Sequence, residues 1–457
     1  MELNLSSGWD SDIDQLTEDE LSSRWRDQTE AYVTAVNSFV RRGMTEGWKN
    51  IDRTEEPKDT TGPMADAVLN AIRRANEVGK TDGLHERFPR SHSPFWEMLR
   101  ENGQSLPVVF LLDDGRMVLQ VGTPSESGHI VLIDGDSVER LSPSIVSIGR
   151  SPNRKFFAVA QPEGISVHQG WDGPVKTFLK WPTGQEAIPQ GFVSQPIQQP
   201  PTITRIVPFN TGEKLLLVGP DGIFVLTANG TKRLLPTDSE MKQHCESSQA
   251  NEAGEPITIG LSMEHGTISP DGKLIAVGHQ DSLHYVVDSE SLKIIGEIGN
   301  MSEYPHHAAF SADGSMIAFN SCHFYHGETI GLPTKLLPGI KTQPYELDNR
   351  IVNLEGKSRV YAAVSRNDEF IIGDASGYLR AFDLQGTIRW QHFIGSTICD
   401  LDISRDERQL IVTTYAGFLC VLDLDTGEAD PFVIGTATHR ERRRWLFWKN
   451  EPKPLIW

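Results

Sequence analysis

The chain has 457 residues, a formal net charge of −19 at pH 7 and 38% hydrophobic residues. It is longer than an ordinary single domain, although a repeat array can reach this length as one unit. The negative charge argues against general nucleic-acid binding, because the protein would repel a phosphate backbone. No apolar run is long enough to cross a bilayer, so we expect no transmembrane segment.

The cysteine content indicates whether the chain resides in a reducing or an oxidising compartment. Cys245, Cys322, Cys399 and Cys420 form no CxxC pair and no metal-finger spacing. So few cysteines in so long a chain are typical of a reducing environment. The first residues, Met1–Leu5, lack the basic and apolar regions of a secretory signal. We therefore predict a cytoplasmic location.

Residues 1–102 are predicted to form a helical N-terminal extension. Thr17-Glu18-Asp19-Glu20 has the spacing of a capping box, and apolar residues then recur three and four apart as far as Arg41-Arg42-Gly43. A second helix is predicted from Pro63 through Ala75, and a short third one over residues 94–100. The apolar faces of these helices could cover the rest of the chain, dimerise or meet a partner helix.

From Leu106 to Asp423 one sequence pattern recurs seven times: a short apolar strand, a tight turn and a second apolar strand. The clearest turns are Ser269-Pro270-Asp271-Gly272 and Ser311-Ala312-Asp313-Gly314. The weaker copies turn at Asp113-Asp114-Gly115, Pro152-Asn153, Thr211-Gly212, Arg366-Asn367-Asp368 and Arg405-Asp406-Glu407. Strand units that repeat without helices favour radial stacking, in which each unit buries its faces against its neighbours.

Each unit is predicted to hold four strands. In the last unit they are Cys399–Ser404, Gln409–Thr414, Phe418–Asp423 and Pro431–Ile434. The third strand often ends in an apolar residue followed by aspartate, as in Ile133-Asp134, Val287-Asp288, Phe382-Asp383 and Leu422-Asp423, whereas the second unit has Trp171-Asp172.

These turns and strand ends resemble those of the WD40-type β-propeller superfamily. Blades of that superfamily carry a Ser-Pro-Asp-Gly turn after the first strand and Trp-Asp after the third. Gly386-Thr387-Ile388-Arg389-Trp390 is similar to quinoprotein-type propellers, so the resemblance extends to the wider WD40/YVTN/quinoprotein-type group. The Gly-His dipeptide that opens WD40 blades is missing, and tryptophan is mostly replaced by another apolar residue. The resemblance implies a binding platform with degenerate WD repeats.

The predicted fold is therefore all-β: a seven-bladed β-propeller over residues 103–436, with the helical extension before it and a basic-aromatic tail over residues 437–457. The first and last blades are each expected to hold four strands of their own, so the ring would close without a borrowed strand. Three long segments, Thr183–Pro201, Thr237–Glu255 and Gly327–Leu347, are predicted to be surface loops, where recognition often lies. Neutral insertion explains them equally well.

No strong enzyme signal is present. The chain lacks a phosphate-binding GxxxxGK[ST] loop, a GxGxxG after a strand, an HExxH and a GxSxG elbow. The acidic run Asp423–Glu428 has the character of a turn between strands. We therefore predict no catalytic residue, no cofactor and no metal.

The first strands provide a positional signal, because first strands line the channel of a propeller. Counting back four residues from the serine position of each turn gives Val108, Ser147, Ile206, His265, His307, Tyr361 and Asp400. The ends of the second strands add His279 and His323 at the same mouth. We predict a partner- or ligand-binding site at the channel mouth, formed by His265, His279, His307, His323, Tyr361 and Asp400. Imidazole and carboxylate groups there could also bind a metal or transfer protons, or simply line a hydrated channel.

The tail is basic and aromatic on an acidic protein. Tryptophan and arginine anchor many interfaces, which predicts partner binding by six tail residues: Arg442, Arg443, Arg444, Trp445, Trp448 and Trp457. Packing of the tail against the chain itself, or contact with a membrane surface or nucleic acid, would use the same residue types.

These observations favour a non-enzymatic scaffold that presents loops and one channel mouth to a protein partner within a larger complex. A propeller hydrolase or lyase is the alternative, using His265, His307 and Asp400 with or without a metal. A small-ligand sensor is a third reading. The sequence leaves the oligomeric state and the identity of the partner open.

Overall fold

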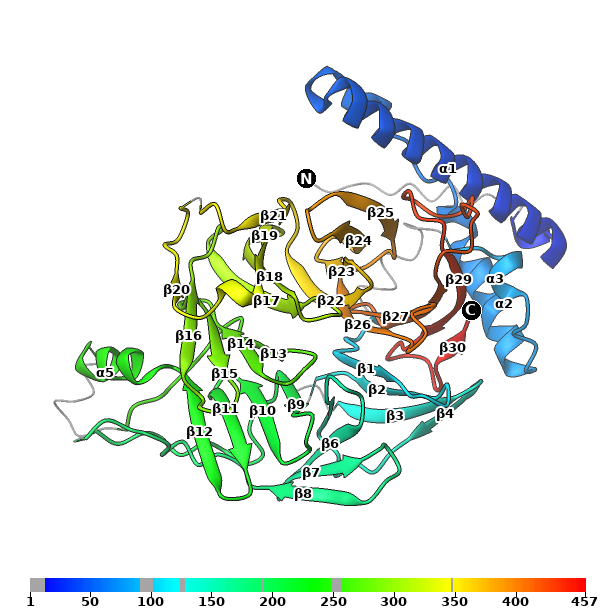
Figure 1. Ribbon diagram of the computed structural model, residues 1–457. Helices are drawn as coiled ribbons and strands as arrows, with labels where there is room; N and C mark the ends of the chain where they lie inside the picture. Colours follow the sequence, from blue (N-terminus) through cyan, green and yellow to red (C-terminus); the bar gives the residue numbers. More distant parts are fainter. Residues whose placement is uncertain (1–12, 91–101, 124–127, 191, 248–255, 347) are drawn as a thin grey trace.

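The computed structural model describes the chain except for residues 1–12, 91–101, 124–127, 191, 248–255 and 347. The strands form seven separate sheets, and the innermost strand of each sheet contacts the innermost strands of its two neighbours around a closed ring (Figure 1). The prediction of a seven-bladed β-propeller is confirmed.

The first three blades follow the sequence order of their strands. Blade 1 consists of β1 (Val108–Leu111), β2 (Met117–Val121), β3 (His129–Asp134) and β4 (Ser137–Arg140). Blade 2 consists of β5 (Ser147–Arg150), β6 (Phe156–Gln161), β7 (Gly164–Gln169) and β8 (Val175–Leu179). Blade 3 consists of β9 (Arg205–Pro208), β10 (Lys214–Gly219), β11 (Gly222–Thr227) and β12 (Gly230–Leu235).

The remaining four blades include two with five strands. Blade 4 has β13 (His265–Ile268), β14 (Leu274–Gly278), β15 (His284–Asp288), β16 (Ile294–Ile298) and β20 (Ile340–Lys341). Blade 5 has β17 (Tyr304–Phe310), β18 (Met316–His323), β19 (His326–Pro333) and β21 (Val352–Glu355). Blade 6 has β22 (Val360–Arg366), β23 (Glu369–Asp374), β24 (Tyr378–Asp383) and β25 (Ile388–Phe393). Blade 7 has β26 (Ile398–Ile403), β27 (Gln409–Thr414), β28 (Phe418–Asp423), β29 (Arg440–Leu446) and β30 (Leu455–Ile456).

The Ser-x-Asp-Gly turns have a clear local cause. In blade 4 the Ser269 hydroxyl donates to Asp271 Oδ1 (2.7 Å) and accepts the backbone N–H of Leu274 (2.9 Å). Gly272 supplies the left-handed conformation that the turn needs, with φ at 78°. The same hydroxyl contacts recur at Ser311. The turn therefore closes the hairpin through local hydrogen bonds, which is why the sequence reveals it.

The aspartates that end the third strands also act locally. The predicted positions at Asp134, Asp288, Asp383 and Asp423 are the last residues of β3, β15, β24 and β28. Asp383 Oδ1, for example, accepts the backbone N–H groups of Gln385 and Thr387. Asp288 Oδ1 likewise accepts the backbone N–H of Ser291, so these two carboxylates satisfy amides of the turns that follow their strands.

The helical extension contains α1 (Glu18–Glu46), α2 (Ala65–Glu77) and α3 (Leu84–Arg87), with 3-10 turns at Ile13–Gln15, Trp48–Asn50, Arg53–Glu55 and Gly62–Met64. The Thr17 capping box is present. Helix α1 continues beyond the predicted end at Gly43 to Glu46. A side chain at Gly43 would collide with the ring of Trp48. The third predicted helix lies outside the described residues. No helix in the described part of the chain is both long and apolar enough to span a bilayer.

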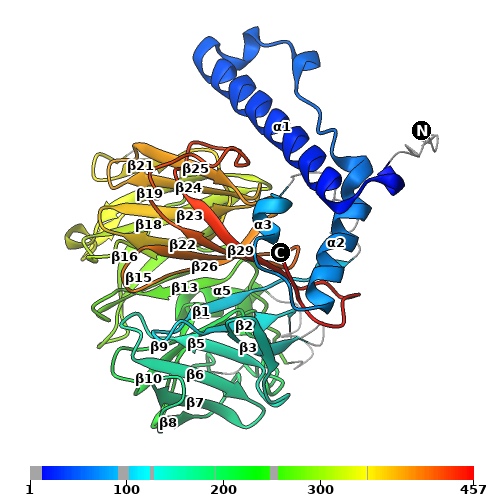
Figure 2. The same ribbon diagram turned by 90° about the vertical axis from the view of Figure 1, so that its right-hand side faces the viewer.

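The extension packs on the side of blade 7. Figure 2 shows α2 and α3 next to β29 and the C-terminus, and both helices contact the outer strands of that blade. Trp25, Ile72 and Phe88 share one hydrophobic core with Leu446 and Trp457. The Trp25 indole donates to the carbonyl oxygen of Pro89 (2.6 Å). Of the three possibilities left open for the helices, this structure shows the first, because their apolar residues pack against the propeller.

The fourth strand predicted at Pro431–Ile434 is wrong. The strand that pairs with β28 is β29, and β30 then pairs with β29. The charged sequence Arg440–Leu446 hides this strand, because Glu441 and Arg444 are buried together instead of apolar residues. The residues predicted to be a separate tail thus contribute the outer strands of blade 7.

Two of the predicted surface loops contain regular structure. Residues 237–255 include helix α5 (Asp238–Ser247), whose start is capped because the Glu240 N–H donates to the Thr237 hydroxyl. The Gly327–Leu347 segment lies largely in β19, a 3-10 turn at Thr334–Leu336, and β20, which pairs in parallel with β16. The prediction of loops is therefore wrong for these two segments. Only the third, Thr183–Pro201, lacks helices and strands in its described residues.

The ring closes between blades 1 and 7 without a borrowed strand, as predicted. Two aspartates of β26 span this seam, since Asp400 Oδ2 accepts the N–H of Val109 (3.0 Å) and Asp402 Oδ2 accepts that of Leu111 (2.7 Å). The Asp402 carboxylate also binds Arg150 from blade 2 (2.6 Å). These side chains therefore bind the backbone of blade 1 across the seam, beside the apolar core that the two blades share.

Candidate functional site

The strand register shows which predicted channel residues lie at one level of the ring. Val108, Ser147, His265, His307 and Asp400 occupy equivalent positions in their hairpins. In blades 3 and 6 the register places Arg205 and Ala362 at that level, so the assignments of Ile206 and Tyr361 are each wrong by one residue. The error in blade 3 arises because its turn begins at Phe209. The error in blade 6 arises because its first hairpin has a shorter turn, in which Arg366 pairs with Glu369. Ile206 instead packs in the core between blades 2 and 3.

A cavity of about 270 Å³ lies at the channel mouth, and we call it the mouth cavity. Its walls come from the first strands of several blades and include Arg205, His265, His306, His307, Tyr361, Cys399 and Tyr415. Three of the six predicted mouth residues therefore line one cavity: His265, His307 and Tyr361.

Three β-bulges shape this cavity. The pairing of β17, β22 and β26 shifts register at the start of each strand, which leaves His306, Tyr361 and Cys399 as the extra residues. A bulge re-aims a side chain, and all three of these residues line the cavity. Counting along an ideal strand cannot find such residues, so the sequence missed His306 and placed Tyr361 at the wrong level.

The hydrogen bonds of His265 fix its tautomer. Its Nδ1 lies 3.2 Å from the carbonyl oxygen of Met263, so this nitrogen carries the proton and donates. Its Nε2 then accepts from Nδ1 of His284 (3.3 Å), and Nε2 of His284 accepts from the Ser321 hydroxyl (3.2 Å). Both nitrogens of His265 are thus engaged in a buried chain. Burial also lowers the pKa of His265 to about 4, which keeps its ring neutral.

His306 is fixed in the same way. Its Nδ1 donates to the carbonyl oxygen of Val360 (2.7 Å), and its Nε2 accepts from the Arg359 guanidinium (3.1 Å). Burial and the neighbouring Arg359 lower the pKa of His306 to about 3. Arg359 also lies over the ring of Tyr361, 4.9 Å from its centroid. These contacts make a rigid wall of the mouth cavity rather than a free base.

His307 differs from these two histidines. In the described residues no hydrogen bond is recorded for either of its ring nitrogens, although the side chain lines the cavity. Burial, and then the charge of Arg205, lower its pKa well below the usual value. Arg205 is itself held by Asp400, with 3.1 Å between Nη2 and Oδ1. Burial raises the pKa of Asp400 while Arg205 opposes this shift.

His279, His323 and Asp400 are not among the residues that line the mouth cavity. His279 caps a turn, where its Nδ1 accepts the N–H of Asp281 (3.3 Å). His323 is half exposed and pairs with Glu303. The Asp400 carboxylate binds Arg205 and accepts the backbone N–H of Val109 at the seam between blades 7 and 1. Among the described residues no group of three or more histidine, cysteine, aspartate or glutamate side chains is placed to hold a metal ion.

An exposed aromatic hairpin tip stands beside the mouth cavity. Strands β18 and β19 are eight residues each, and their turn carries Phe324 and Tyr325, which are 74% and 67% exposed. Arg359 joins this tip to the cavity wall, because its N–H donates to the carbonyl oxygen of Tyr325 and its Nη1 donates to that of Phe324. The apolar pair Phe324-Tyr325 between two histidines was the available sequence signal for this tip.

The buried histidines predict how stability depends on pH. Their pKa values are lower in the folded protein than the 6.5 of an exposed imidazole, so the unfolded chain binds more protons as the pH falls below 6.5. We expect the free energy of unfolding to fall from pH 6.5 towards pH 3, by at most about 1.4 kcal/mol per pH unit for each histidine. Urea titrations at several pH values measure this slope.

The substitution His306→Asn tests the assignment, since the asparagine amide can still donate to Val360. We expect it to flatten the slope between pH 6 and 4, whereas His326→Asn at an exposed position leaves the slope unchanged. An unchanged slope for His306→Asn would contradict a neutral buried ring.

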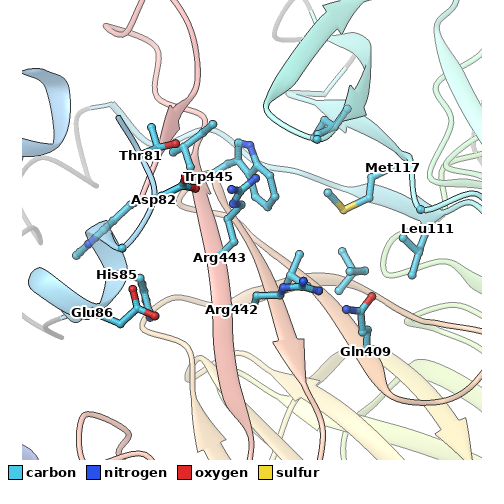
Figure 3. Close-up of a pocket in the computed structure, with 18 residues that line it drawn as sticks. Thr81, Asp82, His85, Glu86, Leu111, Met117, Gln409, Arg442, Arg443 and Trp445 are labelled. Carbon is cyan, nitrogen blue, oxygen red and sulfur yellow. The ribbon is translucent and has the colours of Figure 1, made fainter. Parts of the chain in front are cut away.

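The tail residues line a second cavity of about 360 Å³, which we call the tail pocket. Arg442, Arg443, Trp445 and Trp457 contribute to it. Figure 3 shows Arg442 and Arg443 between the Thr81–Glu86 segment on one side and Leu111 and Met117 of blade 1 on the other. Arg443 lies over the ring of Trp445, 5.5 Å from its centroid, and pairs with Asp136.

The other predicted tail residues are inside the protein. Arg444 forms a buried ion pair with Glu441 (2.7 Å), which also pairs with Arg90 of the extension (3.3 Å). The Trp448 indole donates to Ala416, and the Trp457 indole donates to Phe88. Trp445 is also buried. A partner could reach Arg444 and Trp448 only if the tail left the propeller, whereas Trp445 and Trp457 contribute to the wall of the tail pocket.

The fold and its cavities define a seven-bladed β-propeller with two candidate binding sites. No family model matches this chain, and no curated protein matches it. Among solved structures, the chain is similar to the β-propeller domain of Cps50 (Swd1) from Myceliophteria thermophila, at 11% sequence identity and a TM-score of 0.44. That match covers 71% of this chain and 96% of the other.

Proposed function

We propose that this protein is a non-enzymatic interaction scaffold whose channel mouth contacts a protein partner. The observation that carries the proposal is the Phe324-Tyr325 tip, because two adjacent aromatic side chains are largely exposed beside a polar cavity. Aromatic residues on a rigid hairpin are typical anchors of protein interfaces. The mouth cavity would then receive a polar group of the partner next to Arg205 and His307.

The contacts of the histidines support binding over catalysis. A general base or a metal ligand needs an available ring nitrogen, and both nitrogens of His265 and His306 are engaged. Asp400, the carboxylate of the alternative hydrolase or lyase, is bound to Arg205 and to the backbone of blade 1. The third cavity histidine, His307, forms no hydrogen bond within the described part of the chain, which suits contact with a ligand.

The tail pocket supplies a second contact region in this proposal. Arg442 is exposed, and no ion pair is recorded for it in the described residues. It would contact an acidic group of the same partner or of another one. The four cysteines are free and buried, which supports the proposed cytoplasmic location.

Substitution of the aromatic tip tests the proposal. We expect the double variant Phe324→Ser/Tyr325→Ser to lose a specific partner in quantitative affinity capture, by about tenfold or more, since each exposed anchor contributes about 1–2 kcal/mol. The fold should persist because both side chains lie in solvent.

The matched control removes two exposed apolar side chains from the outer strand of blade 2. Val175 and Phe178 are 55% and 47% exposed, so Val175→Ser/Phe178→Ser changes surface hydrophobicity to a similar extent away from the mouth. Equal recovery of every partner by both variants would refute a role for the mouth. Turnover of a substrate that His307→Ala abolishes would instead favour the enzyme alternative.

A further inference from the structure

A third cavity lies on the face opposite the mouth, where the turns between the first and second strands meet. It measures about 450 Å³ and is formed by blades 1, 2 and 7; we call it the turn-face cavity. Its lining includes Arg116, Arg150, Arg154, Lys155, Arg405 and Trp171. The proposed function makes no use of it.

The floor of this cavity has more positive than negative charge. Arg150 and Arg154 both bind the single carboxylate of Asp402, at 2.6 Å and 3.2 Å, and their side chains are only 10% and 17% exposed. The other charged residues that line the cavity are Arg116, Lys155, Arg405, Asp113, Asp114 and Asp172. Burial, and also the nearby charge of Arg150, lower the pKa of Arg154 despite the opposing effect of Asp402. An anion bound here would relieve this excess of charge.

The backbone of Arg154 gives an independent observation. The turn of each blade has one residue with positive φ, and in blades 1, 3, 4 and 5 this residue is glycine. Blade 2 has Arg154 there, with φ at 60°. A residue with a side chain is disfavoured in this region, as are Asn367 and Glu407 in the turns of blades 6 and 7, so glycine can replace Arg154 without straining the turn.

The hydrogen bonds of Arg154 leave part of that guanidinium available. Its Nη2 donates to Asp402 Oδ1 and to the carbonyl oxygen of Ile403. In the described residues no bond is recorded for its Nε or Nη1. Arg150 uses both of its terminal nitrogens on Asp402 and also donates to the carbonyl oxygen of Leu111. The Nε and Nη1 of Arg154 are therefore the donors that match the oxygens of a phosphate group, because guanidinium N–H groups bind phosphate through charge-assisted hydrogen bonds.

We propose that the turn-face cavity binds a small phosphate-type oxyanion at the Nε and Nη1 of Arg154, with the positive charge of Arg150 beside it. Phe157 and Trp171, whose rings contact edge to face at 5.7 Å, form an apolar wall. Asp113, Asp114 and Asp172 surround the entrance, so a long polyanion would be repelled while a single phosphate group could enter. The ligand is therefore a small molecule with one phosphate group, or inorganic phosphate.

Phosphate binding is measured on the full chain by isothermal titration calorimetry and by thermal unfolding, with sodium phosphate compared against sodium chloride at equal ionic strength. Phenyl phosphate is titrated in parallel. The wild-type protein should bind inorganic phosphate and unfold at a higher temperature in its presence. Tighter binding of phenyl phosphate would indicate that the apolar wall contacts an aromatic ligand, and equal binding would indicate inorganic phosphate.

The decisive variant is Arg154→Gly, which removes the guanidinium and gives the turn the residue that its backbone favours. It should bind phosphate at least about tenfold more weakly, the effect of losing a charge-assisted hydrogen bond. Glu407→Gly is the matched control, because Glu407 has the same φ of 60° in the blade 7 turn. It should bind phosphate as the wild type does.

Two outcomes would overturn the proposal. One is a wild-type protein whose unfolding temperature and heat of titration do not distinguish phosphate from chloride. The other is full phosphate binding by Arg154→Gly. Either result would assign Arg150 and Arg154 solely to the ion pair with Asp402. Neither bears on the channel mouth, which is tested by partner capture.

Discussion

The substitution Asp402→Ala should lower the free energy of unfolding by about 3–5 kcal/mol, the range measured when one partner of a buried ion pair is removed. Asp402 is nearly fully buried and is the common partner of Arg150 and Arg154. It also accepts the N–H of Leu111 across the seam. Alanine leaves two guanidinium groups and one amide without this acceptor, and urea or thermal unfolding measures the loss.

A graded pair of variants separates charge from hydrogen bonding at the seam. Asp402→Asn keeps an oxygen for the Leu111 amide but removes the charge, so its loss should be smaller than that of alanine. Asp134→Ala, at an exposed aspartate that ends β3, should change stability by less than about 0.5 kcal/mol. If Asp402→Ala is as stable as Asp134→Ala, the seam is closed by its apolar core alone.

The second large effect is expected for Glu441→Gln. Glu441 is the acidic centre of the buried cluster with Arg90 and Arg444, and all three side chains are at most 3% exposed. Glutamine removes the only negative charge of this group and leaves two buried guanidinium groups. We expect a loss of about 3–5 kcal/mol in the free energy of unfolding.

The same cluster predicts a dependence on acid. Burial alone would raise the pKa of Glu441, but Arg444 and Arg90 outweigh it and hold this pKa well below the usual 4.5. The stabilisation is therefore complete above pH 4.5 and is lost as the pH falls below that value. Glu441→Gln should reduce the acid sensitivity of unfolding measured between pH 5 and 3.

Glu428→Gln on the exposed loop of blade 7 is the control, and it should leave both the stability and its pH profile near those of the wild type. Equal stability of the Glu441 and Glu428 variants would show that the extension and the last blade are held together by apolar packing. In that case the charges of the cluster would contribute nothing measurable.

The features that the sequence predicted well are those with local causes. The Ser269 turn closes through its own hydroxyl, Asp271 and Gly272, and helix α1 begins at its own capping box. Such contacts join residues within five positions of each other. Seven repeats of one strand–turn–strand pattern were therefore enough to indicate seven blades.

The outer strand of blade 7 was missed because its stability is not local. Arg440–Leu446 begins with five charged residues and resembles a solvated segment. It becomes a strand because Arg90, some 350 residues earlier, neutralises Glu441 in the interior. Binary patterning cannot anticipate a buried ion cluster whose partner lies at the other end of the chain.

The candidate site was predicted only in part, because some of its residues are also placed by strand pairing. Side-chain alternation placed His265 and His307 at the mouth, where the cavity is found. It also placed Tyr361 at the mouth, although at the wrong level, and it did not place His306 or Cys399; all three residues line the cavity through bulges. A bulge adds one residue to a strand, and its position depends on how that strand pairs with its neighbour.

The sequence by itself determined the repeat, its turns and the number of blades, because hydrogen bonds between near neighbours encode them. Only the tertiary structure decided which strands complete the last blade, which histidine nitrogens are engaged and how the ring is closed. Those outcomes depend on tertiary contacts, which range from 19 positions for His265 with His284 to 252 positions for Asp402 with Arg150. The contact of Glu441 with Arg90 also joins distant parts of the chain. A buried charge is stable only beside its partner, and that partner is known only when the chain has folded.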